Sequence, residues 1–334
     1  MYPGAIAPPN TNSADAQTPT RFPDTTGVDF QPQAKGQPMP TAHANGIELE
    51  YETFGDPDKP CVLLIMGLAT QLTAWPDSFC QQLVKHGYFV VRFDNRDVGL
   101  SSKLDHLKVP KIGPLILARL VGLRPPVPYT LDDMAQDAVG LLDALGIERA
   151  HIVGASMGGM IAQLIAAKHS SRAATLTSIM STTGHRSLPN PEPEASKAIF
   201  MKPDDPTSRE SIVIRNVRVR KAVQSPAYPK DDDELRAAAA AAVDRGGYYP
   251  RGVSRQLAAV LHSRDRRRLL RSVRVPSLVI HGEDDPLVPV ACGIDTANNL
   301  PQSELVLYPG MGHDFPEPLM ESMADHIDQL AKGV

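Results

Sequence analysis

Short apolar runs alternate with amphipathic segments along the chain from about residue 44 onward. Residues 47–53 alternate strictly between apolar and polar side chains, which predicts a strand with one solvent-facing side. Residues 61–65 are continuously apolar, as expected for a strand that is covered on both faces. Similar apolar runs predict further strands at residues 88–93, 149–153, 174–180, 276–280 and 305–308.

Helical segments are predicted in the gaps between these strands. Thr130, followed by two aspartates, marks the start of one helix, and Gly146 marks its end. The other predicted helices cover residues 75–86, 159–169, a segment from about residue 290, and residues 319–332. Strands that alternate with helices at this spacing indicate an α/β fold with a doubly wound, mostly parallel sheet.

Residues 183–271 break this alternation, because they contain no clear strand, several prolines and a helical stretch at residues 233–243. We therefore expect a helical cap inserted into a core made of residues 41–182 and 272–334. A group of arginines closes this segment: Arg264, Arg266, Arg267, Arg268, Arg271 and Arg274. An anion site and a solvent-exposed helix face are the two interpretations of the group, and the exposed face is favoured.

Two further segments stand apart from the α/β pattern. Residues 1–40 are rich in Pro, Thr, Ala, Gln and Asn, which predicts a disordered tail or, for residues 21–40, an arm across the body or a partner subunit. Residues 112–123 are almost all apolar but too few to span a bilayer. We expect this stretch to pack under the cap; an apolar wall or entrance for an acyl chain and a dimer patch are the alternatives.

The composition of the chain argues against several classes of function. The chain has 334 residues, a formal net charge of −4 and 22% charged residues, so nothing attracts it as a whole to nucleic acid or an anionic membrane. We find no secretion signal and no membrane-spanning run, and Cys61, Cys80 and Cys292 are too few for a disulfide framework. We expect a cytoplasmic protein with buried or half-buried thiols and no stable membrane insertion; a homodimer stays open.

The stretch Gly154-Ala155-Ser156-Met157-Gly158 lies between a predicted strand and a predicted helix. A serine at such a sharp strand-to-helix turn exposes its hydroxyl at the helix N-terminus, and the flanking glycines avoid collisions with neighbouring elements. We predict that Ser156 is a catalytic nucleophile. Such a serine needs a base that accepts its proton and a carboxylate that orients the base.

His313 is the predicted base. Its glycine-rich loop follows the last strand, so it lies at the same sheet edge as Ser156, where parallel strands end and ligands bind. His281 ends a strand directly before a glycine and is interpreted as structural. His151 starts the strand that leads to Ser156 and is expected at the far edge, away from the chemistry.

Asp285 is the predicted acid, because it precedes a proline-rich turn, residues 286–289, that would fix it toward a histidine. Asp284 is the alternative. The loop after the preceding strand, residues 181–187, contains no carboxylate, which strengthens the choice of Asp285. The backbone N–H groups of Met157 and Leu68 are the expected donors to a developing oxyanion.

Together, five motifs resemble the α/β-hydrolase superfamily over residues 44–332: Met66-Gly67-Leu68, residues 92–101, the Ser156 turn, residues 282–289 and residues 310–313. The resemblance implies an eight-stranded sheet, the nucleophile Ser156, the base His313, the acid Asp285, and an oxyanion hole at Leu68 and Met157. Met66 stands where many relatives carry histidine, and Asp97 where many carry glycine. The first and second motifs are most similar to aclacinomycin methylesterase and related carboxylesterases.

We therefore expect a serine hydrolase that cleaves small apolar carboxylic esters through an acyl-enzyme on Ser156, without cofactor or metal. A lactonase, a thioesterase or a C–C bond hydrolase could use the same residues, since the cap and pocket select the substrate. A small-molecule receptor that has kept the fold is the alternative from another class. Relatives with aspartate in place of the serine are dehalogenases or epoxide hydrolases, which Ser156 argues against.

Overall fold

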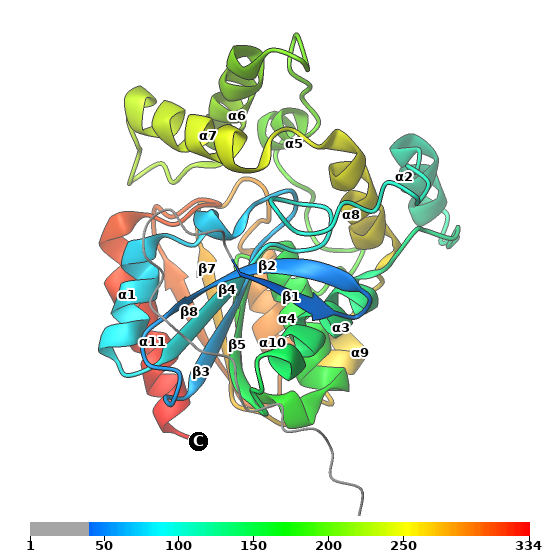
Figure 1. Ribbon diagram of the computed structural model, residues 1–334. Helices are drawn as coiled ribbons and strands as arrows, with labels where there is room; N and C mark the ends of the chain where they lie inside the picture. The colour runs from blue at the N-terminus through cyan, green and yellow to red at the C-terminus, as the bar shows by residue number, and fades with distance from the viewer. Residues whose placement is uncertain (1–39) are drawn as a thin grey trace, which may run out of the picture. The chain divides into compact units, whose positions relative to one another are not determined.

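Eight strands form one sheet in the computed structural model, which describes residues 40–334 (Figure 1). Their order is β1-β2-β4-β3-β5-β6-β7-β8; β1 and β2 pair antiparallel with their neighbours, and the remaining pairs are parallel. The strands are β1 (Thr41–Ala44), β2 (Ile47–Phe54), β3 (Cys61–Ile65), β4 (Phe89–Phe93), β5 (Ala150–Ala155), β6 (Ala173–Ile179), β7 (Ser277–Gly282) and β8 (Ser303–Tyr308). The predicted α/β fold with its mostly parallel sheet is confirmed. The expected tail at residues 1–40 lies, apart from Pro40, outside the described residues.

Seven of these strands agree with the strands predicted from the sequence to within two residues, and β1 is the one that the pattern did not locate. β1 forms a hairpin with β2 in which Ala44 pairs with Ile47. The two connecting residues, Asn45 and Gly46, both have positive φ, as a two-residue hairpin turn requires. The Asn-Gly pair is the sequence signal for this strand.

Helices cover both faces of the sheet (Figure 1). On one face α1 (Asp77–Lys85) packs against α11 (Glu317–Lys332), and on the other α3 (Leu131–Ala144) packs against α4 (Met157–Lys168). α10 (Ala291–Asn299) packs on β7 and β8. Short 3-10 turns are η1 (Leu72–Ala74) and η2 (Ser170–Arg172). α1 begins two residues later than the helix predicted from residue 75, because Pro76 occupies its N-cap.

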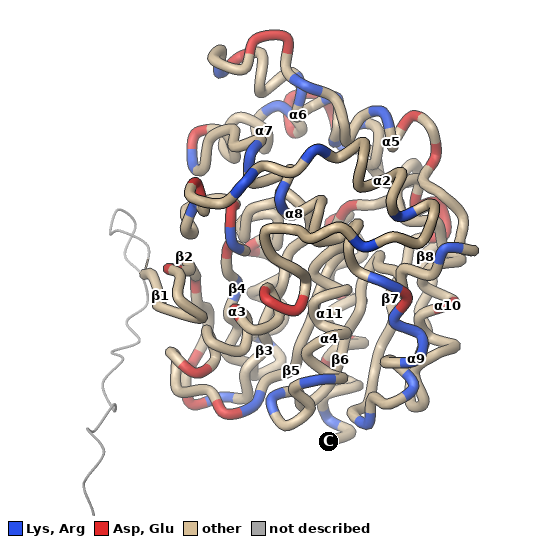
Figure 2. Tube along the Cα trace, turned by 90° about the vertical axis from the view of Figure 1, so that its right-hand side faces the viewer, with Lys and Arg blue, Asp and Glu red and all other residues tan. Residues whose placement is uncertain are grey.

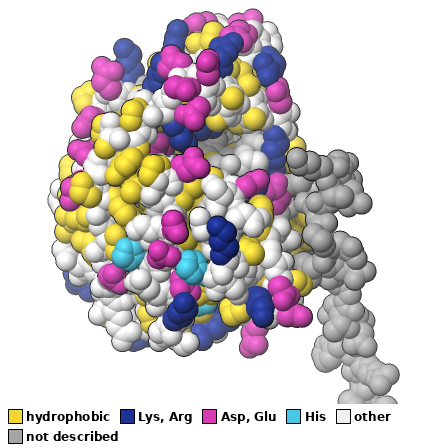
Figure 3. Space-filling view, turned by 90° about the vertical axis from the view of Figure 1, so that its left-hand side faces the viewer, with side chains coloured by type: hydrophobic (Ala, Val, Ile, Leu, Met, Phe, Trp, Pro, Cys, Tyr) yellow, Lys and Arg dark blue, Asp and Glu magenta, His cyan; other side chains and the backbone are white. Residues whose placement is uncertain are grey.

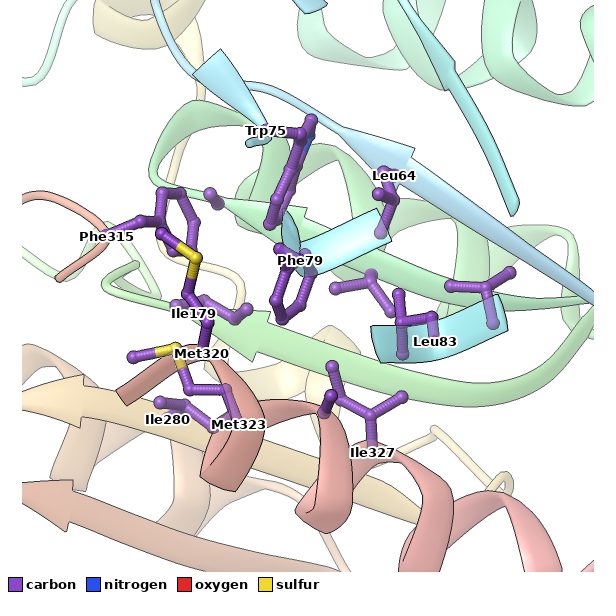
Figure 4. Packing of buried hydrophobic residues seen from close by; sticks show 14 of the residues in the cluster. Leu64, Trp75, Phe79, Leu83, Ile179, Ile280, Phe315, Met320, Met323 and Ile327 are labelled. Carbon is purple, nitrogen blue, oxygen red and sulfur yellow. The ribbon is translucent and has the colours of Figure 1, made fainter. Parts of the chain in front are cut away.

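An aromatic and methionine-rich core fills the space between the sheet and the α1–α11 layer (Figure 4). The Trp75 ring stacks on Phe79 with centroids 5.6 Å apart and lies 4.8 Å from the Phe315 ring. Met66 belongs to the same buried cluster. Phe315 follows His313 by two residues and Met66 follows β3 directly, so this core fixes two loops that border the sheet edge described below.

The alternation in β2 is only partly reflected in its burial. Glu48 is exposed and Leu49 is buried, as predicted, but Glu50 is only 4% exposed, so the expected wet face is wrong at this position. The loop after β4 lies over Glu50. The Glu50 N–H donates to Ser101 Oγ, and the Glu50 carbonyl accepts from the Asp94 N–H. Periodicity cannot reveal cover that comes from a distant loop.

The residues between β6 and β7 form five helices. They are α5 (Pro193–Ile199), α6 (Arg209–Val223), α7 (Asp232–Gly246), α8 (Pro250–His262) and α9 (Arg267–Leu270). α6 packs against α5 and α7, whereas α9 packs against α4 and α10 on the side of the sheet. Figure 1 shows α5, α6 and α7 beyond one end of the sheet.

The arginine group around α9 is divided between surface and interior. Arg264, Arg268, Arg271 and Arg274 are exposed, in agreement with a solvent-facing helix. The same expectation is wrong for Arg266, which is 4% exposed and donates to Gln163 Oε1 and to the Thr182 carbonyl. Its guanidinium joins the segment before α9 to α4 and to the loop after β6.

The apolar stretch at residues 112–123 forms α2 (Ile112–Leu120) and the turn that follows it. α2 packs against α8, as Figure 1 shows, but only Leu115 is buried among its residues. The expectation that the stretch packs under the cap is therefore wrong for most of its side chains. Hydrophobicity predicts that such a helix is buried, but it does not identify the element that buries it.

On the face shown in Figure 3, Lys and Arg alternate with Asp and Glu without a broad area of one sign. Within residues 40–334, no helix has the length and the apolar character that crossing a bilayer demands.

Candidate active site

The carboxyl ends of the parallel strands bring the predicted residues to one edge of the sheet. Ile65 at the end of β3 pairs with Gly154 of β5, and Gly282 at the end of β7 pairs with Tyr308 of β8, so these strands end level with one another. The segments that follow β5, β7 and β8 carry Ser156, Asp285 and His313, respectively. Ligand sites of parallel sheets form at this edge.

Ser156 occupies the turn between β5 and α4 with φ 56° and ψ −118°, a strained backbone conformation for serine. Its N–H donates to the Ile179 carbonyl at 2.9 Å, and its own carbonyl accepts from Ser181 Oγ at 2.7 Å. A Cβ at Gly158 would lie 2.0 Å from the Ile65 carbonyl oxygen, so only glycine fits there. The turn therefore presents the Ser156 hydroxyl at the N-terminus of α4.

Ser156, His313 and Asp285 form one hydrogen-bonded chain. The Ser156 Oγ lies 3.0 Å from His313 Nε2, and His313 Nδ1 lies 2.7 Å from Asp285 Oδ2. The Asp285 side chain is fully buried, and that of His313 is 9% exposed. The structure thus brings together three residues that are up to 157 positions apart in the sequence.

The two adjacent aspartates have different partners. Asp285 Oδ1 accepts from the N–H groups of Leu287 and Val288, at 2.9 and 2.8 Å, which leaves Oδ2 for His313. The exposed Asp284 accepts from Gly310 N–H at 2.9 Å and does not reach the histidine. The proline-rich turn orients Asp285 in the predicted manner.

The inserted residues hold the loop that carries His313. The His313 N–H donates to the Val223 carbonyl at 2.8 Å, and Gly312 N–H donates to Ser225 Oγ at 2.8 Å. The Ser225 hydroxyl donates in turn to Asp314. Burial raises the pKa of Asp314, and the hydrogen bond from Ser225 opposes this rise. His313 is thus held on one side by the buried core around Phe315 and on the other by Val223 at the end of α6.

His281 and His151 lie where they were predicted from the sequence. His281 Nε2 lies 2.7 Å from the Val288 carbonyl, and burial lowers the pKa of this imidazole, so the neutral ring donates to the turn that carries Asp285. His151 pairs with Thr175 near the start of β5, and burial lowers its pKa to about 4. Neither ring contacts Ser156.

The loop after β3 lies directly against the Ser156 turn. A Cβ at Gly67 would meet Ser156 Cβ at 3.1 Å and Oγ at 3.6 Å. In residues 40–334 we find no acceptor for the N–H groups of Leu68 and Met157, the two predicted oxyanion donors. Both amides are therefore free to bind a ligand oxygen.

Two buried side chains fix this loop. Asn95 Nδ2 donates to the Met66 carbonyl at 2.9 Å, while the Met66 side chain packs into the core beside Trp75. Gln256 Oε1 accepts from Ala69 N–H at 2.8 Å, and Ala69 has a positive φ of 57°. Met66 is thus supported by packing and by Asn95.

A buried ion pair joins α8 to the loop after β4. Arg255 Nε donates to Asp97 Oδ2 and Arg255 Nη2 donates to Asp97 Oδ1, both at 2.7 Å, and both side chains are fully buried. Tyr129 and the Leu104 N–H also donate to this carboxylate. Burial opposes its ionisation, but these hydrogen bonds hold the pKa of Asp97 below its ordinary value. Asp97 is therefore an anchor for α8.

Hydrogen bonds also join α7 to the loops after β3 and β4. Arg245 Nη1 donates to Asp94 Oδ2 at 2.7 Å and to Gln71 Oε1 at 2.8 Å. Gln71 Nε2 donates to the Ala242 carbonyl on α7 at 2.7 Å. No role for these residues could be predicted from the sequence, although Asp94 lies in the motif at residues 92–101.

Among the described residues, no three His, Cys, Asp or Glu side chains are grouped so that they could hold a metal ion. Cys61, Cys80 and Cys292 are buried and unpaired, as predicted. Burial raises the pKa of each of these thiols, which favours the unreactive protonated form.

Comparison with known proteins gives both sequence and structural relatives. The family described as alpha/beta hydrolase fold matches residues 60–317. Rhodomycin D methylesterase DnrP of Streptomyces peucetius is 29% identical over 311 residues, which cover 86% of this chain and 98% of that protein. Rhodomycin D methylesterase DauP of Streptomyces sp. strain C5 is 27% identical over 301 residues, covering 84% and 95%. The structure of an enol-lactonase from Burkholderia xenovorans LB400 is similar in fold, with a TM-score of 0.65, 23% identity, and coverage of 88% of this chain and 100% of that one.

Proposed function

Because the chain belongs to the alpha/beta hydrolase fold family, we propose that it is a serine hydrolase that cleaves carboxylic ester bonds through an acyl-enzyme on Ser156. The observation that carries this proposal is the hydrogen-bonded chain from the Ser156 hydroxyl through His313 to Asp285. Two relatives that match along nearly their whole length are named methylesterases, which favours esters as the substrate class.

In the proposed reaction, Ser156 Oγ attacks the ester carbonyl carbon while His313 Nε2 accepts the hydroxyl proton. Asp285 accepts the hydrogen bond from His313 Nδ1–H, which fixes the ring and stabilises the imidazolium. The imidazolium then protonates the leaving alcohol. A water molecule, deprotonated by His313, attacks the acyl-enzyme, and the acid product leaves as the Ser156 hydroxyl is restored.

The negative charge that develops on the carbonyl oxygen needs donors that are already in place. The Leu68 and Met157 N–H groups would supply them, since Gly67 lies against Ser156 and Met157 starts α4. The positive end of the α4 dipole adds to this stabilisation.

The helices between β6 and β7 would act as a cap that selects small apolar esters, with residues 183–271 forming the cap proposed from the sequence. Support comes from the contacts of this segment with both loops beside Ser156: Gln256 binds the loop after β3, and Val223 binds the His313 loop. Differences in the cap would then change the substrate and leave the chemistry unaltered.

The test is hydrolysis of p-nitrophenyl esters of graded chain length, beside a matched series of lactones. Ser156→Ala should lower kcat by a factor on the order of 10⁶, while the exposed Ser170→Ala should keep the wild-type rate. A folded Ser156→Ala protein with wild-type turnover would refute the proposal. Binding of the substrates without turnover by the wild type would indicate a receptor, and faster turnover of lactones than of open esters would indicate a lactonase.

A further inference from the structure

The segment at residues 116–123 exposes an unusual amount of apolar surface. Leu117, Leu120, Val121 and Leu123 are 63%, 73%, 63% and 66% exposed, and Ile116 is 38% exposed. These five residues are half of the ten large exposed hydrophobic residues in the part of the chain that the structure describes. Single exposed leucines are common on protein surfaces, but a contiguous group of this kind marks an interaction site.

The outward orientation of this group follows from how α2 is held. Leu115 is the buried residue of the helix, and Arg119, one turn later on the same side, donates to the Leu261, Ser263 and Gly184 carbonyls at 3.0, 2.8 and 3.1 Å. Leu117, Leu120 and Val121 share the opposite side of the helix, at spacings of three and four residues. Arg119 thus fixes which side of α2 faces the solvent.

The charged residues in the stretch of sequence that carries this apolar face are all basic. Between Asp105 and Asp132 there is no Asp or Glu, whereas Lys108, Lys111, Arg119 and Arg124 fall in the interval. Lys108, Lys111 and Arg124 are exposed, and the Arg124 side chain is within electrostatic range of Arg264 as well as Asp132. Figure 2 shows α2 on the side of the protein turned toward the viewer. This local excess of positive charge contrasts with the net charge of −4 for the chain.

We propose that α2 and the turn after it dock the protein on the surface of an anionic lipid bilayer. Apolar side chains that project beyond a helix, flanked by lysine and arginine, enter the boundary between headgroups and acyl chains while the cations contact anionic headgroups. The segment is too short to cross the bilayer, so the binding is peripheral and reversible. The proposal stands on exposure and charge alone and does not depend on the proposed reaction.

A second copy of this chain is the competing occupant, and charge argues against it. A symmetric contact through this face would bring Lys108, Lys111 and Arg124 of the two copies close together, and the segment carries no acid to pair with them. An anionic lipid surface matches both properties of the segment. Each basic residue near such a surface strengthens binding by about fivefold.

The test is co-sedimentation of the full chain with vesicles of phosphatidylglycerol and phosphatidylcholine, compared with vesicles of phosphatidylcholine alone. We expect binding to the anionic vesicles that weakens as salt is added. The double variant Leu117→Ser/Leu120→Ser should weaken the partition by about a hundredfold, and Lys108→Glu/Lys111→Glu should weaken it more than tenfold at low salt. Phe200→Ser is the matched control, because Phe200 is 51% exposed but lies outside the segment.

All variants change exposed side chains, and circular dichroism and melting temperatures are measured to check that each is folded. If the wild type stays in the supernatant with anionic vesicles at every lipid concentration, the proposal is wrong. Equal binding by the wild type and the double-leucine variant would also overturn it. A dimer in light scattering that Leu117→Ser/Leu120→Ser converts to a monomer, without vesicle binding, would assign the face to self-association.

Discussion

Asp284 and Asp285 are neighbours in sequence, but only Asp285 faces His313. We predict that Asp285→Asn lowers kcat for p-nitrophenyl acetate by about 10⁴, because the amide no longer favours the productive tautomer of the imidazole. Asp284→Asn is the matched control and should change kcat little, since the Asp284 side chain accepts only from the Gly310 N–H among the described residues and an amide oxygen can accept the same bond. A large loss in Asp284→Asn with a small loss in Asp285→Asn would reverse the assignment.

Glu50 provides a prediction about stability and pH. Burial raises its pKa to about 7 from the ordinary value of 4.5, with Asp94 and Glu52 adding to the rise and Arg245 opposing it. The unfolded chain therefore loses this proton at a lower pH than the folded chain does, so the free energy of unfolding falls as pH rises from 4.5 to 7. A glutamine at this position has no proton to lose.

Glu50→Gln should consequently melt at a higher temperature than the wild type at pH 8, and the difference should shrink toward pH 4. Thermal melts across this pH range check the result. Glu48→Gln, at an exposed position on the same strand, serves as the control. A constant difference between Glu50→Gln and the wild type at all pH values would show that ionisation of Glu50 is not its cause.

At the scale of elements, α8 positions the loop after β3. Gln256 Oε1 holds the Ala69 N–H, one residue beyond the proposed oxyanion donor Leu68, while Gln256 Nε2 donates to the Arg96 carbonyl at 2.7 Å. Removing the side chain would release the loop without touching the triad. The stabilisation lost would be that of the transition state, since the donors bind the developing oxyanion more strongly than the ground-state carbonyl.

Gln256→Ala should therefore lower kcat by about tenfold with little change in KM, and weaken binding of a trifluoromethyl ketone by a similar factor. Steady-state kinetics and inhibition constants provide the readout. Ser254→Ala, at a partly exposed site on the same helix, should match the wild type in both. If Gln256→Ala raised KM and left kcat unchanged, Gln256 would contact substrate and would not position the loop.

The helices and strands could be predicted from the sequence where their burial follows the pattern of apolar residues along the chain. The continuous apolar runs of β3 and β7 are buried at every residue, because helices cover both faces of these strands. The sequence could not show that α2 presents its leucines to solvent. That orientation depends on Arg119, whose carbonyl partners at residues 261 and 263 lie more than 140 positions away in the chain.

At the scale of the whole molecule, the Arg255–Asp97 pair locks the inserted helices onto the sheet. Both charges are fully buried. Arg255→Met should lower the free energy of unfolding by about 3–5 kcal/mol, because Asp97 would remain as an unpaired buried charge. Urea denaturation measures this change.

Arg251→Met is the matched control on the same helix. Arg251 pairs with Asp105 at 2.8 Å, but both side chains are more than half exposed, so its loss should cost less than about 1 kcal/mol. Equal losses in the two variants would mean that the buried pair does not anchor α8. A wild-type urea midpoint for Arg255→Met would lead to the same conclusion.

The nucleophile, base and acid could be predicted from the sequence because each follows a recognisable strand, and parallel strands end at a common edge. The anchors Asn95, Asp97, Arg255 and Gln256 could not. Arg255 and Gln256 lie on α8, whose position over the sheet does not follow from chain order, and Arg255 and Asp97 are separated by 158 positions. The positive φ of 68° at Asp97 is a further property that only the structure reveals.

The identity of the nucleophile is tested most directly by reacting the protein with a fluorophosphonate and locating the adduct by mass spectrometry of its peptides. We predict a single phosphonylated residue, Ser156, loss of ester hydrolysis in proportion to labelling, and slow labelling in His313→Ala. Labelling of a different residue in step with the loss of hydrolysis, or unimpaired hydrolysis by fully labelled protein, would contradict this prediction.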